Sequence, residues 1–62
     1  MSKYYVIYNI SYDKYEPLCI NNNLDEVEEL TLKYQKIERI KYGNYKEVTE
    51  EEYLKVTAGK SL

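Results

Sequence analysis

The sequence has no histidine, phenylalanine or tryptophan, and only one cysteine, one proline and two glycines among 62 residues. Without histidine there is no imidazole to act as a general base or to bind a metal. Cys19 has no partner for an internal disulfide, and alone it cannot supply a tetrahedral zinc site. Gly43 and Gly59 are too isolated to form a phosphate-binding loop. We therefore expect no metal, no cofactor and no enzymatic activity.

The chain also lacks long apolar runs, since no stretch approaches the roughly 20 apolar residues that cross a bilayer. Its length predicts one domain, residues 1–62, which buries only about 60% of the surface of the unfolded chain. Further stabilisation then comes from self-association or from a partner. The single cysteine and the lack of a signal-peptide pattern in MSKYYVIYNI favour a reducing compartment, so we expect a cytoplasmic protein with no membrane segment.

Tyrosine supplies every aromatic side chain, and five of the nine tyrosines lie in KYYVIYNISYDKYEP, residues 3–17. Alternation over residues 4–12 predicts a strand. The even-numbered residues of its predicted buried face are Tyr4, Val6, Tyr8, Ile10 and Tyr12. Tyr5 and Ile7 are then expected on the opposite, exposed face, where a tyrosine beside an isoleucine favours self-association or a partner. We expect these two residues to form a homodimer contact or a second partner surface.

The rest of the chain predicts five more elements, two of them paired in a hairpin. A second strand is expected at PLCIN, a helix at NNNLDEVEELTLKYQ, a hairpin at KIERIKYGNYKEV and a short helix at TEEEYLKVTAG. Gly43-Asn44 is the predicted hairpin tip, Asn23 caps the first helix, and Thr49 with Glu52 forms a capping box for the second. The expected fold is α+β, β-β-α-β-β-α, with an antiparallel-rich four-stranded sheet in the order 2-1-3-4.

The small net charge of −2 conceals an acidic segment, because residues 21–35 carry a net charge of −3. Carboxylates beside an apolar residue can imitate DNA phosphates to a nucleic-acid-binding protein. The alternative is a solvated helix face with acids favoured at the positive end of the helix dipole. The candidate partner-binding residues are Asp25, Glu26, Glu28, Glu29 and Leu32.

A basic segment follows, because residues 36–46 carry a net charge of +3. In the predicted hairpin, Arg39, Lys41 and Lys46 share one face. Cations interleaved with stacking rings bind single-stranded nucleic acid. The predicted strand pairing places Tyr42 and Tyr45 on the opposite face from these cations. Direct nucleic-acid binding, as a small accessory protein, is therefore the alternative function and not the leading one.

The element order resembles that of phage-encoded uracil-DNA glycosylase inhibitors over residues 4–42: strand YYVIYNISY, turn DKYE, strand PLCIN, acidic helix NLDEVEELTLKY and strand KIERIKY. Size and composition also resemble those of anti-CRISPR proteins. In the glycosylase inhibitors, acidic and apolar groups occupy the DNA-binding site of the enzyme. The resemblance implies a non-enzymatic inhibitor of a host or defence protein that binds nucleic acid, acting in the bacterial cytoplasm. It also implies that Glu28, Glu29 and Leu32 lie on the inhibitory surface.

Overall fold

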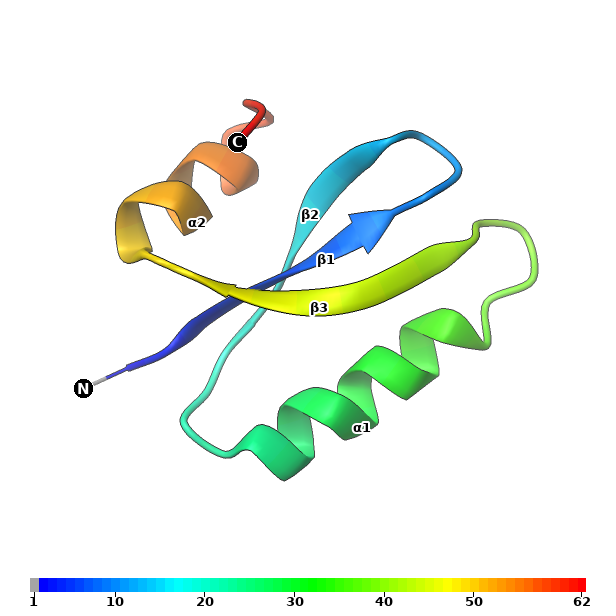
Figure 1. Cartoon of the computed structure of the whole chain (residues 1–62), viewed down its shortest axis with the longest axis horizontal. Helices are drawn as coiled ribbons and strands as arrows, with labels where there is room; N and C mark the ends of the chain where they lie inside the picture. The colour runs from blue at the N-terminus through cyan, green and yellow to red at the C-terminus, as the bar shows by residue number, and fades with distance from the viewer. Residues whose placement is uncertain (1) are drawn as a thin grey trace.

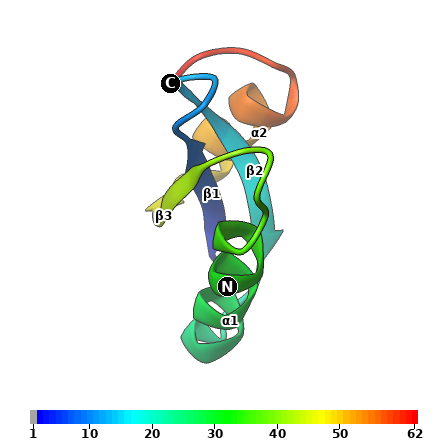
Figure 2. The ribbon, with the colours of Figure 1, turned by 90° about the vertical axis from the view of Figure 1, so that its right-hand side faces the viewer.

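The computed structural model describes residues 2–62, which form three strands and two helices. The strands are β1 (Tyr4–Asn9), β2 (Lys14–Ile20) and β3 (Tyr42–Val48), and the helices are α1 (Leu24–Gln35) and α2 (Glu50–Thr57). β1 is the central strand of a sheet with the order β2-β1-β3, and it pairs with both neighbours in the antiparallel sense. Two views show the helices apart, with the strands between them (Figure 1, Figure 2). The α+β class is confirmed.

The predicted four-stranded sheet in the order 2-1-3-4 is wrong. Residues 36–41 connect α1 with β3 and form no strand, whereas residues 42–48 form one continuous strand beside β1. Gly43 and Asn44 therefore lie inside β3 and not at a hairpin tip. The pairing of β3 with β1 is irregular at this point. Such a bulge accommodates an extra residue without ending the strand.

The path of α1 determines the direction of β3. β2 ends at Ile20, which pairs with Tyr4 at the start of β1. β3 begins at Tyr42, which pairs with Asn9 at the other end of β1. α1 therefore carries the chain back along the sheet, and β3 runs parallel to β2 with β1 between them (Figure 1). A βαβ crossover of this kind needs the full length of a helix to connect its strands.

Gly43→Ala is expected to raise the free energy of unfolding by about 0.4–1 kcal/mol, because alanine restricts the unfolded chain more than glycine does. Gly43 has a negative φ, and a Cβ atom there would meet the Ile10 and Tyr8 side chains at ordinary contact distances of 3.5–3.7 Å. Urea denaturation of both proteins measures the change. A loss of stability would contradict the continuous strand, because a tight hairpin turn needs the positive φ that glycine permits.

Both faces of β1 are buried, each under a different helix. Tyr5 and Ile7 are 3% and 0% exposed and pack with Val27 of α1, whereas Val6 packs with Val56 of α2. The expectation that Tyr5 and Ile7 lie on an exposed face is wrong, so these side chains are not accessible as a dimer contact. Alternation identifies the two faces of a strand, but it does not reveal that each face has a helix to cover it.

The even-numbered face predicted to be buried ends before the predicted strand does. Tyr4 and Tyr8 are half-buried against α2 and β2, whereas Ile10 and Tyr12 lie in the turn after β1 and are exposed, Tyr12 by 65%. β1 ends at Asn9, whose side-chain oxygen accepts the backbone N–H of Tyr12 at 3.0 Å. An asparagine that bonds the backbone in this way favours a turn over a longer strand.

The predicted helix starts are confirmed. The Asn23 side chain accepts the backbone N–H groups of Asp25 and Glu26, and the Thr49–Glu52 capping box is complete. Each cap satisfies amide groups that have no partner within the helix. The cap at Asn23 fixes the start of α1, and with it the position of the acidic residues in the first two turns.

Candidate partner-binding site

The exposed side of α1 carries most of the predicted partner-binding residues. At about 100° per residue, four of the five fall within roughly 100° of arc around the helix. These four, which we call the acidic face, are Asp25, Glu28, Glu29 and Leu32, and all are exposed. Leu32 is 57% exposed, as expected for a residue outside the buried stripe. Glu26 lies to one side, where its carboxylate accepts a hydrogen bond from Nδ2 of the Asn21 side chain.

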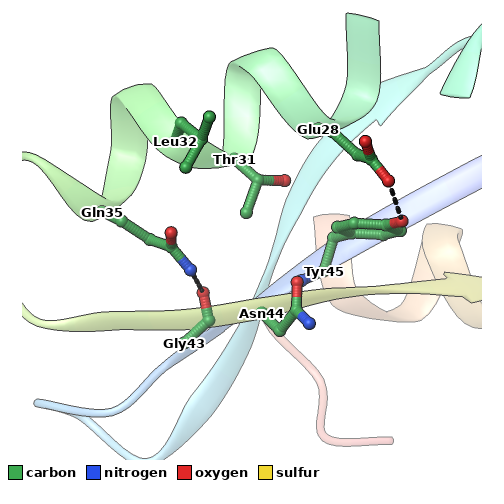
Figure 3. Close-up of a pocket in the computed structure, with 7 residues that line it drawn as sticks. All are labelled: Glu28, Thr31, Leu32, Gln35, Gly43, Asn44 and Tyr45. Atoms are coloured by element: carbon green, nitrogen blue, oxygen red, sulfur yellow. Dashed lines mark hydrogen bonds between the residues drawn. The ribbon is translucent and has the colours of Figure 1, made fainter. Parts of the chain in front are cut away.

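A groove runs between α1 and β3 (Figure 3). Its volume is about 530 Å³, and its walls are formed by Glu28, Thr31, Leu32 and Gln35 of α1 and by Gly43, Asn44 and Tyr45 of β3. Two of the predicted residues, Glu28 and Leu32, therefore lie on one wall. The structure joins them to residues of a strand that is distant in the sequence.

Two hydrogen bonds cross the groove, one near each end (Figure 3). Gln35 Nε2 donates to the carbonyl oxygen of Gly43 at 2.8 Å, and the Tyr45 hydroxyl donates to the Glu28 carboxylate at 3.3 Å. Burial and the nearby Glu28 carboxylate raise the pKa of Tyr45. In this hydrogen bond the phenol is the donor and the carboxylate oxygen of Glu28 is the acceptor.

The sequence reasoning missed Gln35 and Tyr45 as parts of a site. A signal was present, because Glu28, Leu32 and Gln35 recur at the i, i+4 and i+7 spacing of one helix stripe. This stripe borders the buried one, and on its own it indicates only a solvated surface. It becomes a groove wall because β3 lies beside it. The incorrect hairpin prediction gave no reason to expect Tyr45 next to this stripe.

A second polar cluster lies at the end of the sheet, between β1, β2 and β3. The Glu16 carboxylate accepts two hydrogen bonds, one from Nδ2 of Asn9 at 2.6 Å and one from the hydroxyl of Tyr42 at 3.0 Å. Burial and the hydrogen bond to Glu16 raise the pKa of Tyr42 to about 12. The Tyr34 ring packs edge-on against Tyr42, with 5.1 Å between ring centroids. The described residues leave no buried side-chain polar atom unpaired, so we assign this cluster a structural role.

The three cations of the alternative nucleic-acid surface do not share a strand face. Arg39 and Lys41 lie in the connection between α1 and β3, where the Lys41 amide donates to Ser11 Oγ at 2.8 Å. Lys46 lies in β3, and its Nζ is 5.6 Å from the centre of the Tyr15 ring. The predicted hairpin face that would have aligned them is absent from the structure.

Cys19 and the carboxylates offer little chemistry. Burial, together with the negative charge of Glu26, raises the pKa of the Cys19 thiol. A thiol of raised pKa is a weak nucleophile at neutral pH. Within residues 2–62, no three acidic or thiol side chains converge closely enough to hold a metal ion.

No helix formed by residues 2–62 combines the length and the apolar character that crossing a bilayer requires. The resemblance to phage-encoded inhibitors remains a hypothesis. Comparison with protein-family models, with curated proteins and with solved structures finds no match to this chain.

Proposed function

We propose that this protein is a non-enzymatic inhibitor of phage type. It binds a host or defence protein that recognises nucleic acid, and it blocks the DNA site of that protein by mimicry. The observation that carries the proposal is the acidic face, where three carboxylates precede, on the same side of α1, a leucine that is 57% exposed. Carboxylates can occupy the phosphate positions of a DNA-binding surface, while an apolar side chain adds contact area and specificity.

The spacing of the carboxylates supports mimicry. Asp25, Glu28 and Glu29 lie within about 6 Å along the axis of α1, at 1.5 Å per residue. One strand of DNA carries one charge per roughly 3.4 Å of axis. The charge density along α1 is therefore comparable with that of a single nucleic-acid strand. It also lies on one side of the helix, where a cationic groove can contact it.

The anchoring of α1 also supports mimicry, because a rigid surface loses little entropy on binding. Val27 and Thr31, on the opposite side of the helix, are buried against the sheet. The Thr31 hydroxyl donates to the carbonyl oxygen of Val27 at 2.8 Å, so this buried polar group is satisfied within the helix. The acidic face is thus held in place before a partner arrives.

The double substitution Glu28→Lys, Glu29→Lys is expected to leave the protein folded but to abolish inhibition. Both side chains are exposed, and surface changes alter stability by about 0.5 kcal/mol or less. Reversing both charges turns attraction to a cationic DNA site into repulsion. Bacterial uracil-DNA glycosylase is the first target to assay, by release of uracil from DNA. Affinity capture from a bacterial lysate, read by mass spectrometry, extends the search to other targets.

A matched control is Glu38→Lys, Glu51→Lys, which makes the same charge change at exposed positions outside α1. We expect this control to inhibit and to capture as the wild type does. A folded Glu28→Lys, Glu29→Lys variant that still binds its target would eliminate the acidic face. Salt-sensitive retention of the wild type on a DNA column, without any captured protein, would instead support the nucleic-acid-binding alternative at Arg39, Lys41 and Lys46.

A further inference from the structure

β3 has a free edge, because the sheet order β2-β1-β3 leaves it with a neighbour on one side only. The carbonyl oxygen of Gly43 accepts a hydrogen bond from Gln35 Nε2, and the backbone N–H of Tyr45 donates to Asn44 Oδ1. An edge strand presents backbone groups of this kind on its unpaired side. Alternation along a strand directs the backbone groups of Glu47 the same way. Three alternate residues, at positions 43, 45 and 47, therefore offer backbone groups to an incoming strand.

Side chains of the protein itself occupy the edge. Gln35 Nε2 donates to the Gly43 oxygen at 2.8 Å, and Asn44 Oδ1 accepts the Tyr45 amide at 2.8 Å. Gln35 and Asn44 are both exposed, so rotating them away from β3 breaks no core contact. An incoming strand could replace each bond with a backbone bond of similar strength. The edge is thus covered by groups that are exchangeable.

We propose that the β3 edge binds an extended segment of a partner protein by strand addition, with the groove between α1 and β3 receiving its side chains. Strand addition combines backbone hydrogen bonds with pockets for every second side chain. The groove of about 530 Å³ can receive a side chain of the added strand, with Leu32 and the Tyr45 ring as its apolar contacts among polar walls. The inference rests on the proposed function for the existence of a partner, and it adds the form in which that partner binds.

The charges beside the edge specify a basic residue in this segment. Glu47 pairs with Tyr5, so it lies on the same face of the sheet as α1 and as Glu28, which bonds Tyr45. The lysine of β3, Lys46, lies on the opposite face over the Tyr15 ring. The carboxylate of Glu28, on the wall of the groove, and that of Glu47, on β3, thus lie on the same face of the sheet beside the edge. The recognised pattern is an apolar residue and a lysine or arginine two positions apart.

The same charges disfavour a second copy of this chain as the occupant. If two copies of the chain paired their β3 edges antiparallel, with Tyr45 at the centre, both α1 helices would lie on the same face of the joined sheet. Each α1 would then lie beside the β3 strand of the other copy. The carboxylates of Glu28 and Glu47 in both copies would then share that face. Like charges placed across paired strands are destabilising. A basic segment from another protein avoids this repulsion.

The test is an NMR titration of the ¹⁵N-labelled protein with the synthetic peptide TVTKTVTKTV. We expect the largest shifts at the amides of Gly43, Tyr45 and Glu47 and at the side-chain amide of Gln35. N-methylating every second peptide residue is expected to weaken binding by about tenfold or more, because several backbone donors are lost. The peptide TVTETVTETV is expected to bind more weakly than TVTKTVTKTV, because its glutamates face Glu28 and Glu47.

Two variants at Glu47 separate the backbone from the charge. Glu47→Pro removes the outward N–H, and proline is tolerated at an edge strand where that N–H faces solvent. Glu47→Gln changes the charge equally but keeps the donor. We expect the proline variant to bind TVTKTVTKTV about tenfold more weakly than the glutamine variant. If the proline variant does not fold, the N-methylated peptide still tests the backbone bonds.

Three results would overturn strand addition by a basic segment. These are shifts confined to Asp25 and Glu29, equal binding of the two peptides, and a wild-type dimer that Glu47→Pro dissociates in sedimentation. Failure of the proposed function is distinguishable from these. A protein that binds the peptide at the β3 edge but inhibits and captures no target retains the edge site and loses the inhibitor role.

Discussion

Replacing Ile7 with alanine is expected to remove a large part of the folding free energy of this protein, between about a quarter and all of it. Ile7 is 0% exposed and packs in the cluster under α1. Truncating a buried isoleucine to alanine costs about 2–5 kcal/mol, because apolar contacts are lost and a cavity remains. A chain of this length has roughly 3–9 kcal/mol of stability in total. Urea denaturation followed by circular dichroism measures the loss.

Ile37→Ala is the matched control, because the same side chain is truncated at a position that is 45% exposed, in the connection between α1 and β3. We expect it to change stability by about 0.5 kcal/mol or less. If Ile7→Ala were as stable as the wild type and only its association state changed, Ile7 would lie on an exposed sheet face. The structure excludes that arrangement, since α1 covers this face.

Replacing Asn9 with aspartate is the second substitution with a large expected effect. Asn9 is 0% exposed, and its Nδ2 donates to the Glu16 carboxylate at 2.6 Å. A carboxylate at this position cannot donate, and it would lie against a second carboxylate. Leaving a charge unpaired in a buried site costs about 3–5 kcal/mol. Asn9→Asp is therefore expected to unfold a large fraction of the molecules at pH 7.

This loss is expected to depend on pH. In the folded Asn9→Asp variant, one proton shared between the two carboxyl groups removes the repulsion and restores a donor. The folded variant then binds a proton that the unfolded chain releases, so its stability rises as the pH falls from 7 toward 5. Thermal unfolding at several pH values, with the wild type in parallel, measures this.

A compensating substitution provides the control for Asn9→Asp. Adding Glu16→Gln replaces one carboxylate with an amide that donates to the other. We expect the double variant to be more stable than Asn9→Asp at pH 7 and to lose the gain at low pH. A double variant no more stable than Asn9→Asp would show that the repulsion between residues 9 and 16 is not the cause.

The helices were predictable from the sequence because their signals are local. Asn23 and Thr49 cap helices through groups two or three residues away, so a short window contains the whole interaction. At the end of α2, Gly59 has a φ of 80°, and the Lys60 and Gly59 amides donate to the carbonyl oxygens of Lys55 and Val56. This arrangement is likewise complete within six residues.

The strands were harder to predict because their neighbours are distant. A hairpin turn at Gly43-Asn44 and a bulged strand through the same residues both place Tyr42 and Tyr45 on one face. In the structure both tyrosines pack on the side of α1, Tyr42 against Tyr34 and Tyr45 against Tyr5. The choice between turn and strand therefore depends on contacts with α1 and β1, which a local pattern does not contain.

The candidate site was predictable in its charge but not in its shape. The carboxylates at positions 25, 28 and 29 follow from the sequence, and in the structure these residues are exposed on α1. Their role in binding a partner stays a prediction. The groove required the position of β3, which packs beside α1 only because the chain between them forms a connection and no additional strand. Gln35 shows the difference, since its partner is a backbone carbonyl of another element.

Burial of β1 on both faces has a consequence for strand alignment. Because residues 5, 6 and 7 are all buried and apolar, sliding β1 by one residue against β2 and β3 would still present an apolar side chain to each helix. Hydrophobic burial alone therefore specifies the alignment only weakly. Asn9 specifies it, because the same slip would turn its amide to the other face of the sheet, away from the Glu16 carboxylate that it bonds. One polar side chain selects the correct pairing from alternatives that the core alone hardly distinguishes.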